Sequence, residues 1–312
     1  MCKYLIRPLT STSRADESSE VALADATLIG GRRTRDALMS QIGTSPGSWP
    51  RRSLEGESKA AERVVAVIPA AGRARRLGDS VPGSKEVADV GGEPVCAHLL
   101  RRLALAGVSQ AIVVLGDGKW DVPQTLLGYR SLGVDLAYVV VGESPSELHS
   151  VAAGLSFTSG RLVALGYPDI LFEPRDAFSV LLDCQSHTSA DLVLGLFPTD
   201  RPERVDMVVL DHQLQPVEVV IKQPDRGLRY SWSIAVWTSS FSGYLVDFLT
   251  HVDKDQADTA VQQGPAELSV GDVFQAALGD GLAAEAVVFE QGSYLDVGTP
   301  GDLAEARRIV TG

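Results

Sequence analysis

Short apolar runs alternate with amphipathic stretches along most of this chain. Residues 64–68 form a continuous β-branched run, Val-Val-Ala-Val-Ile, as expected of a strand that is buried on both faces of a sheet. Residues 94–106 place leucines along one side of a helix, and Gly107 is a typical helix stop. Strands and helices that alternate at short spacing predict an α/β, Rossmann-like fold, in which helices cover both faces of a mixed, mostly parallel sheet. Further strands are expected at residues 111–115, 135–141, 162–165 and 191–197, and a helix at residues 174–184.

The pattern becomes more antiparallel after residue 200. Residues 207–210 and 217–221 flank Asp211-His212-Gln213 in the way that two strands flank a hairpin turn. Another strand is expected at residues 234–238. The predicted sheet therefore continues beyond its parallel part.

Three segments carry the polar residues that typically begin a helix. In each, a serine or threonine hydroxyl can accept a hydrogen bond from a free backbone N–H of the first turn. The N-caps are expected at Ser144, Ser269 and Thr299, which predicts helices that begin at Pro145, extend over residues 269–278, and extend over residues 300–310.

Residues 1–62 lack this organisation. They are rich in Ser, Thr, Arg and Gly and have no sustained apolar period, which is typical of a flexible extension. We therefore expect a flexible extension at residues 1–62, followed by one domain at residues 63–312. No additional C-terminal coil domain is expected, because the chain ends directly after the predicted closing helix.

The composition of the chain excludes some classes of binding partner. The formal net charge of -12 repels nucleic acid and anionic membranes, so we expect neither as a partner. No apolar run approaches the ~20 residues that a membrane-spanning helix needs. The 3 cysteines have no metal-ligand or disulfide spacing, which favours a reducing cytoplasm. A phosphate-bearing substrate would have to be attracted by a local basic site.

Such a basic site follows the first predicted strand. Small residues end the strand and allow the backbone to approach a phosphate closely, so that amide groups can bind its oxygens. The segment is neither a GxxxxGK[ST] nor a GxGxxG motif, and its arginines could also lie in solvent after an ordinary turn. Phosphate contacts are expected from Ala70, Ala71, Gly72 and Arg75, and neutralisation of the triphosphate charge from Arg76 and Lys85.

Two aspartates follow predicted strand ends or glycine-rich turns. Asp169 follows the fourth predicted strand, at the edge where ligands bind to parallel sheets. Asp296 lies between Gly292 and Gly298. Mg²⁺ prefers carboxylate oxygens together with substrate phosphates. A strand-end aspartate can instead cap the following turn, and this alternative stays open for Asp169.

These motifs resemble those of the sugar-1-phosphate nucleotidylyltransferase family. The similarity covers the phosphate-binding turn with its later Pro-Lys pair, the strand-end aspartate, an Ile221-Lys222-Gln223-Pro224 element in place of Glu-Lys-Pro, and Tyr294-Leu295-Asp296-Val297-Gly298-Thr299-Pro300 in place of Trp-x-Asp-x-Gly-Thr-Pro. It extends from about Arg63 to the C-terminus and implies the nucleotide-diphospho-sugar transferase fold. The chain departs from the family at Ala74, Pro168, Ile221 and Tyr294.

The resemblance implies a reaction and a set of roles. A nucleoside monophosphate would pass from an NTP to a sugar 1-phosphate or cyclitol phosphate, with release of pyrophosphate. Asp169 and Asp296 would hold Mg²⁺, and Lys222 would bind the acceptor phosphate. Glu143 and Glu147 are candidates for contacts with the base, although both could simply be acidic residues at a helix N-terminus. Tyr230 and Trp232 are candidates for sugar contacts, although aromatic residues are equally typical of a core.

Other functions remain open at this stage. The Pro-Ala-Ala-Gly opening is also similar to cytidylyltransferases that act on polyol phosphates. Changes such as Pro168 and Ile221 are compatible with a catalytically inactive nucleotide-binding relative. A glycosyltransferase with a similar sheet would require a DxD motif, and none occurs near the fourth predicted strand. The base, the acceptor and the formation of a homo-oligomer are not determined by the sequence.

Overall fold

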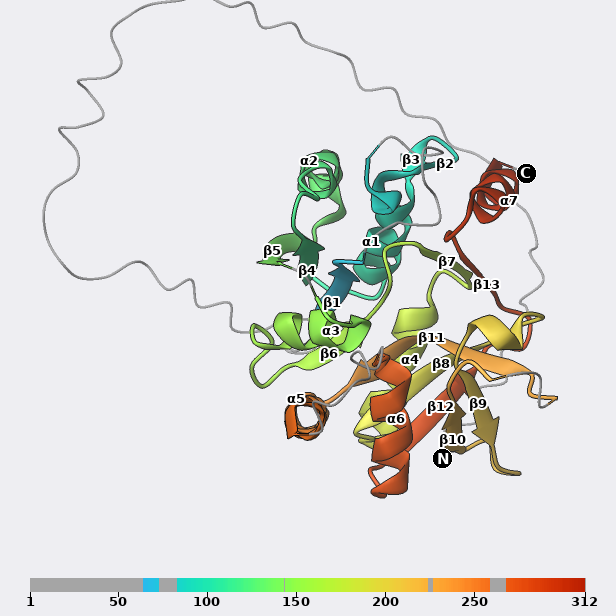
Figure 1. Ribbon diagram of the computed structural model, residues 1–312. Coiled ribbons are helices and arrows are strands. Elements are labelled where there is room, and N and C mark those ends of the chain that lie inside the picture. The colour runs from blue at the N-terminus through green and yellow to red at the C-terminus, as the bar shows by residue number, and fades with distance from the viewer. Residues whose placement is uncertain (1–63, 73–82, 143, 224–226, 259–267, 312) are drawn as a thin grey trace, which may run out of the picture. The chain divides into compact units, whose positions relative to one another are not determined.

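Parallel strands form the centre of the computed structural model, which describes residues 64–72, 83–142, 144–223, 227–258 and 268–311 (Figure 1). Strand β1 (Val64–Ala70) lies between β4 (Gln110–Gly116) and β6 (Leu162–Leu165), and β5 (Asp135–Val141) follows β4; all four are parallel. Every side chain of β1 except Pro69 is buried. Burial on both faces explains the continuous apolar run in the sequence.

The sheet continues on the other side of β6 with antiparallel pairs. Strand β11 (Tyr230–Trp237) pairs antiparallel with β6 and also with β8 (Leu192–Pro198). The hairpin of β9 (Met207–Leu210) and β10 (Pro216–Val220) adds to β11, while β12 (Ala284–Val288) runs parallel to β8. The prediction of a mixed, mostly parallel sheet is confirmed.

Alternate residues of β1 pack against different helices. Ala66 and Ile68 join a cluster with residues of α1 (Val95–Leu105) and α4 (Ala177–Thr188). Val65 and Val67 join a second cluster with α3 (Glu147–Leu155), α5 (Ser239–Asp258) and α6 (Val270–Gly279). Helices therefore cover both faces, as the strand pattern requires. In the part of the chain that is described, no helix is both long and apolar enough to cross a membrane.

Two small sheets, the helices α2 and α7 and three short 3-10 segments complete the part of the fold that the structure describes. β7 (Ile170–Glu173) pairs with β13 (Ser293–Asp296), and β2 (Asp89–Val90) pairs with β3 (Glu93–Pro94). Residues of both small sheets share an apolar cluster with α7 (Pro300–Thr311). The remaining helices are α2 (Asp121–Leu126) and three short 3-10 segments at Lys85–Val87, Leu127–Leu132 and Pro202–Arg204.

One predicted helix start is wrong and two are confirmed. Ser269 and Asp272 form the expected capping box of α6, and the Thr299 hydroxyl accepts a hydrogen bond from Asp302 N at 3.2 Å in α7. Helix α3 begins later than expected, at Glu147, with Ser146 as its N-cap. The backbone of Ser146 is extended (φ -150°, ψ 172°), so the helix cannot begin before it, and the Ser144 hydroxyl donates to Ser146 O at 2.8 Å instead.

The predicted extension, residues 1–62, lies outside the described residues, so the proposed division into an extension and a domain stays a prediction.

Candidate functional site

Loops from three parallel strands meet at one edge of the sheet. The register places Ala70 of β1 opposite Leu115 of β4, and Val67 of β1 opposite Leu165 of β6. The segments that follow these strands therefore emerge side by side, where ligands bind to open parallel sheets. A methyl group on Gly116 would lie 2.7 Å from Ala71 O, so β4 must end in glycine to pass this loop.

The end of β1 leaves space above the backbone. Ala70 is buried, Ala71 is half-buried, and Gly72 is exposed. A Cβ atom on Gly72 would meet no atom of the described residues within 4 Å, its chain neighbours aside. The open space fits the predicted approach of a phosphate to residues 70–72. Arg75 and Arg76 belong to residues 73–82, outside the described residues, and so does Glu143; their roles stay predictions.

A side chain from α2 fixes the loop in front of Lys85. The Asp121 carboxylate accepts hydrogen bonds from Ser84 N at 2.6 Å and from Ser84 Oγ at 2.7 Å. Burial acts to raise the pKa of Asp121, but these hydrogen bonds outweigh burial and lower it. Gly83 has φ +97°, and a Cβ there would lie 2.5 Å from Asp121 Oδ2. A glycine is therefore required at residue 83, and the start of the Lys85 segment is held by hydrogen bonds.

Lys85 and the two predicted metal ligands are brought together. Lys85 Nζ forms an ion pair with Asp169, which is only 6% exposed. Burial of the ammonium works in the opposite direction, but Asp169 raises the pKa of Lys85 to about 12, with smaller contributions from Glu86 and Asp296. Lys85 therefore stays charged at physiological pH, as electrostatic stabilisation of a polyphosphate requires.

Backbone pairing explains why the two aspartates are neighbours. Asp296 ends β13 opposite Ile170, the first residue of β7, and Asp169 directly precedes that strand. Val297 N also donates to Asp169 O at 2.9 Å. Asp169 and Asp296 are 127 residues apart in the sequence, yet main-chain hydrogen bonds hold them at the same end of one ribbon.

The donor set fits a magnesium ion that is shared with a substrate. Asp169 and Asp296 supply carboxylate oxygens, the ligands that Mg²⁺ prefers. Among the described residues, no group of three or more His, Cys, Asp and Glu side chains is arranged to hold a metal ion. A metal at this position would therefore complete its coordination with phosphate oxygens and water.

A second ion pair lies directly behind Lys85. Glu86 is fully buried, and its Oε1 accepts from Lys119 Nζ at 2.7 Å. Burial raises the pKa of Glu86, and the Lys119 ammonium opposes this effect. Lys119 follows β4, so the pair links the loop after β4 to the Lys85 segment.

A second polar cluster surrounds the N-terminus of α3. The Tyr167 hydroxyl donates to Glu147 Oε1. Burial raises the pKa of Glu147 to about 7; Tyr167 and Lys222 oppose the rise, whereas Asp206 and Asp169 favour it. The charge of Lys222 therefore acts on Glu147. The contact of Glu147 with a nucleotide base stays a prediction.

Lys222 is exposed and has a left-handed backbone, with φ +38°. Such a conformation is uncommon for a residue with a long side chain and is often found at functional sites. Its ammonium affects the pKa of both Glu147 and Asp206, so Lys222 faces this second cluster. That position suits a cation that would bind the acceptor phosphate.

The two aromatic candidates differ in burial. Tyr230 is half-buried, and the Arg229 guanidinium lies 5.2 Å from its ring centre. Trp232 is 8% exposed and packs edge-on against Phe274, with 4.8 Å between ring centres. Trp232 therefore contributes to the core, as the alternative interpretation of the sequence allowed, and its indole edge is considered further below.

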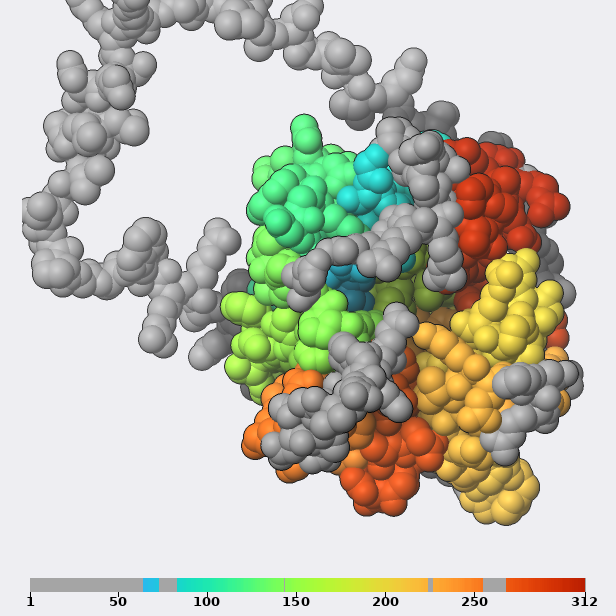
Figure 2. Space-filling view, viewed as in Figure 1, coloured from blue at the N-terminus to red at the C-terminus, as the bar shows by residue number. Residues whose placement is uncertain are grey.

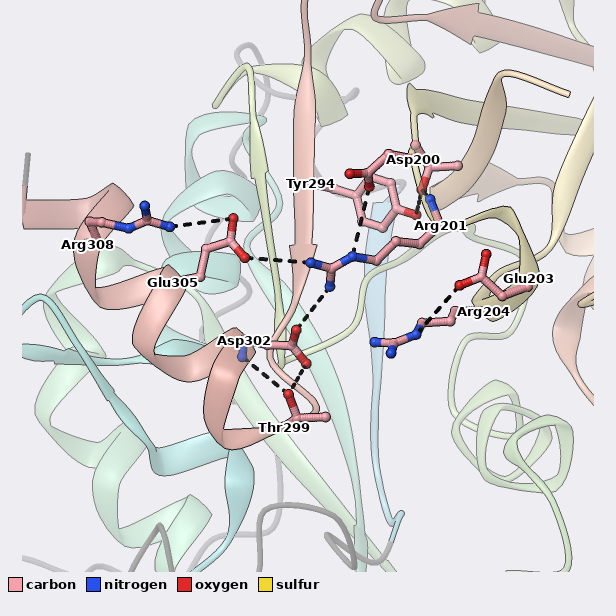
Figure 3. Close-up of polar contacts among 10 residues, drawn as sticks. Asp200, Arg201, Glu203, Arg204, Tyr294, Thr299, Asp302, Glu305 and Arg308 are labelled. Carbon is pink, nitrogen blue, oxygen red and sulfur yellow. Dashed lines mark hydrogen bonds and ion pairs between the residues drawn. The ribbon is translucent and has the colours of Figure 1, made fainter. Parts of the chain in front are cut away.

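Polar contacts join both β13 and α7 to the segment that follows β8 (Figure 3). Tyr294 donates from its hydroxyl to Thr199 Oγ1 at 3.1 Å. Arg201 donates to Asp302 Oδ1 at 3.1 Å, and the Thr299 hydroxyl donates to Asp302 Oδ2 at 2.7 Å. Figure 2 shows the atoms of α7, in red, next to the yellow segment that follows β8. These contacts join the C-terminal helix to the middle of the chain.

Sequence reasoning did not identify Glu86, Asp121, Tyr167 or Asp206. Glu86 and Asp121 could have been suspected as acids within or after the Lys85 motif, but their partners become apparent only in the fold. Asp206 immediately precedes the predicted strand at residues 207–210, so pairing of that hairpin would have placed it opposite residue 221.

Comparisons with known proteins give a match to one family and several similar chains. The family model of the MobA-like NTP transferase domain matches residues 66–232. The chain is similar to the low-salt glycan biosynthesis nucleotidyltransferase Agl11 of Haloferax volcanii, with 26% identity over 231 residues, which cover 73% of this chain and 60% of Agl11. It is also similar to a 2-C-methyl-D-erythritol 4-phosphate cytidylyltransferase of Streptomyces coelicolor, with 37% identity over 95 residues, which cover 30% of this chain and 34% of the relative.

The match thus spans less than two thirds of each curated relative. Among solved structures, the fold is similar to that of a proposed glucose-1-phosphate thymidylyltransferase from Bacillus anthracis, solved with sucrose. The TM-score is 0.68 with 17% identity, and the similarity covers 80% of this chain and 95% of that structure. This similarity confirms the predicted fold.

Proposed function

Because this chain belongs to the family of MobA-like NTP transferase domains, we propose that it transfers a nucleoside monophosphate from an NTP to a phosphorylated acceptor and releases pyrophosphate. The observation that carries the proposal is the grouping of Lys85, Asp169 and Asp296 at the carboxyl edge of the sheet. A cation beside two carboxylates is the arrangement expected for a metal-bound triphosphate.

In this reaction an oxygen of the acceptor phosphate attacks the α-phosphorus. A phosphorus–oxygen bond forms to the acceptor, and the bond between the α-phosphorus and the bridging oxygen of the leaving pyrophosphate breaks. The acceptor oxygen is already anionic, so no side chain has to remove a proton. Positioning and charge neutralisation are sufficient for such a transfer.

The residues of the chain divide into two groups for this task. Backbone groups at residues 70–72 bind phosphate oxygens, and Lys85 neutralises charge near the α-phosphorus. Lys222, on the other side, holds the acceptor phosphate. Mg²⁺ held by Asp169 and Asp296 would supply further charge neutralisation at the phosphates.

We propose a sugar 1-phosphate or cyclitol phosphate as the acceptor. The role of Agl11 in glycan biosynthesis supports a glycosyl acceptor. Ile221, next to Lys222, offers no hydrogen-bond acceptor to a hydroxyl. An acceptor that differs from plain glucose 1-phosphate is consistent with that apolar contact.

A cytidylyltransferase that acts on a polyol phosphate is the second candidate. The similarity to the Streptomyces coelicolor cytidylyltransferase favours it, although that match covers only 30% of this chain. The two candidates share the site and differ in the base and the acceptor, so one assay separates them.

The test is pyrophosphate release from ATP, CTP, GTP, UTP and dTTP, each with a panel of sugar, cyclitol and polyol phosphates and with Mg²⁺. Turnover is expected with at least one pair. Asp169→Asn and Asp296→Asn should each lower kcat by at least about 100-fold, while Asp200→Asn, whose side chain is 94% exposed, should not. No release with any pair would overturn the proposal, and full activity of Asp169→Asn or Asp296→Asn would overturn the metal assignment.

A further inference from the structure

Strand pairing places Asp206 at the centre of the second polar cluster. Met207 pairs with Val220 of β10 and with Ser231 of β11. Continued by one residue, this antiparallel register puts Asp206 opposite Ile221 on one side and opposite Trp232 on the other. Residues directly opposite each other in antiparallel strands share a face of the sheet. Asp206 therefore lies on the same face as Ile221, next to the lysine that we assign to the acceptor phosphate.

The same face is closed by the first turn of α6. A Cβ on Gly271 would lie 2.3 Å from Asp206 Oδ2 and 2.8 Å from Ile221 Cδ1. The Ser269 hydroxyl donates to Asp206 Oδ2 at 3.4 Å, near the limit for such a bond. One oxygen of Asp206 is thus directed at α6 and is weakly bound there.

The other oxygen of Asp206 has no hydrogen-bond partner among the described residues, and neither has the indole nitrogen of Trp232. Both residues are 8% exposed, so water does not readily satisfy these atoms. Burial raises the pKa of Asp206, whereas Lys222 and hydrogen-bonding contacts from the side chains of Ser269 and Trp232 oppose the rise. The Trp232 indole therefore lies beside the Asp206 carboxyl, yet within the described residues neither Asp206 Oδ1 nor the indole nitrogen has a hydrogen bond of good geometry, which is uncommon for buried groups.

One chemical group can satisfy both atoms at once. A hydroxyl donates one hydrogen bond and accepts others, whereas an ammonium only donates and an ether or fluorine only accepts. Resting on the proposed function, we infer that Asp206 and Trp232 bind a hydroxyl group of the acceptor, whose phosphate lies on Lys222. The carboxylate that residue 221 cannot supply thus comes from the neighbouring strand at residue 206.

A purely structural role accounts for less of the geometry. The N-terminus of α6 does not need Asp206 as a cap. Asp272 already accepts hydrogen bonds from Ser269 N at 2.8 Å and from Ser269 Oγ at 3.0 Å. That role also gives the Trp232 indole no partner except Asp206 itself, to which it has no hydrogen bond of good geometry among the described residues. A bound hydroxyl would form hydrogen bonds with both Asp206 and Trp232. Such a site discriminates against analogues that lack the hydroxyl.

The experiment combines variants of the enzyme with analogues of the acceptor. The panel above identifies the acceptor with the highest kcat/KM; its monodeoxy and monoamino analogues are then assayed by pyrophosphate release. Variants are Asp206→Ala, which removes the acceptor atom, and Trp232→Phe, which removes the donor and keeps the ring contact with Phe274. Asp211→Ala is the matched control, because Asp211 stabilises the turn of the same hairpin by accepting from Gln213 N and Gln215 N.

One deoxy position should lower kcat/KM of the wild type by about 10- to 100-fold, mainly through KM for the acceptor. Asp206→Ala should cause a similar loss with the parent acceptor and little additional loss with that deoxy analogue. Trp232→Phe should give a smaller loss with the same dependence, and Asp211→Ala should leave the discrimination between analogues unchanged.

Equal losses with every analogue, or an unchanged KM for the acceptor in Asp206→Ala, would overturn the inference and leave the proposed function intact. A preferred amino analogue would also overturn it, because an ammonium leaves the indole N–H unpaired. Failure of the wild type to release pyrophosphate with any acceptor would instead overturn the proposed function.

Discussion

Gly72 and Gly166 are single residues at which a methyl group has opposite consequences. In the part of the chain that the structure describes, a Cβ on Gly72 would meet no atom within 4 Å beyond its chain neighbours, whereas a Cβ on Gly166 would lie 2.6 Å from Leu99 Cδ1. The first glycine therefore keeps space for a ligand, and the second keeps space for the core. Stability and activity can be separated by comparing the two.

Gly72→Ala is expected to change the free energy of unfolding by less than about 0.5 kcal/mol. It should raise KM for the NTP by about 10-fold or more, because the methyl group occupies the space that a phosphate oxygen needs. Chemical denaturation and steady-state kinetics measure the two effects. Gly166→Ala is the control and should lose about 1–3 kcal/mol of stability through overpacking. Normal KM in Gly72→Ala would contradict phosphate binding at this turn.

Glu147 should make the fold less stable as the solution becomes less acidic. Its pKa is raised from 4.5 to about 7, so the folded state binds a proton more tightly than the unfolded state. The free energy of unfolding should therefore fall as pH rises from about 4.5 to about 7 and then level off. Glu147→Gln, which keeps an oxygen for the Tyr167 hydroxyl, should remove about 3 kcal/mol of this decline.

Urea denaturation at several pH values between 4 and 8 measures the effect. The same pH dependence in the wild type and in Glu147→Gln would show that the carboxyl is solvated and titrates normally.

Candidate site residues could be predicted from the sequence when they belong to a recognisable motif. Asp169 and Lys85 could be identified from the sequence because each belongs to a strand end or turn with a chemical reason for its residue type. Asp206 could not, because its surroundings depend on strand register and on α6, which follows it by more than 60 residues. The structure brings Lys85, Asp169 and Asp296 together, but the roles assigned to them, as to Tyr230 and Lys222, remain predictions.

At the scale of elements, α7 depends on a small number of polar contacts. Asp302 is 8% exposed and accepts from both Thr299 and Arg201. Asp302→Ala should lower the free energy of unfolding by about 1–3 kcal/mol, since Arg201 loses a charged partner. Amide hydrogen exchange should accelerate first in Pro300–Thr311.

Glu305→Ala is the matched control, because its contact with Arg201 is longer, 3.8 Å, and lies at the surface. It should cost about 0.5 kcal/mol or less. Although burial opposes it, hydrogen bonds from Thr299 and Arg201 lower the pKa of Asp302. The difference between the two variants should therefore shrink as pH falls through that lowered pKa, and a difference that is independent of pH would contradict the assignment.

Elements with a repeating apolar pattern were predicted well, and isolated short ones were not. β4, β5 and β6 lie within one residue of their expected ends, since each has a run of apolar residues, which in β4 and β6 is almost entirely buried. β7 and β13 were missed because each has four residues and is stabilised by the other, far away in the sequence. α5 was also missed; its sequence, rich in Ser and Asp, has a weaker pattern.

At the scale of the whole molecule, a net charge of -12 must be overcome by every anionic substrate. Binding of an NTP should therefore depend strongly on the divalent ion. A saturating NTP with Mg²⁺, at about 100 times its Kd, should stabilise the fold by about 2.7 kcal/mol, which corresponds to a rise of roughly 5–10 °C in Tm.

Removal of the metal with EDTA should abolish most of this rise, and Mg²⁺ without nucleotide should produce little of it. Differential scanning calorimetry of the wild type and of Asp296→Asn measures both effects. An equal rise in Tm without a divalent ion would show that the cationic side chains alone bind the triphosphate.

The ribbon of β7 and β13 has a consequence for how far such a chain can diverge. Because main-chain hydrogen bonds join the neighbours of Asp169 and Asp296, the spacing of the two acids is almost independent of which side chains surround them. Core residues can then be exchanged over many generations while the pair survives. The two acids of the proposed site should therefore keep their spacing in variants with a repacked surrounding core, provided that β7 and β13 remain paired.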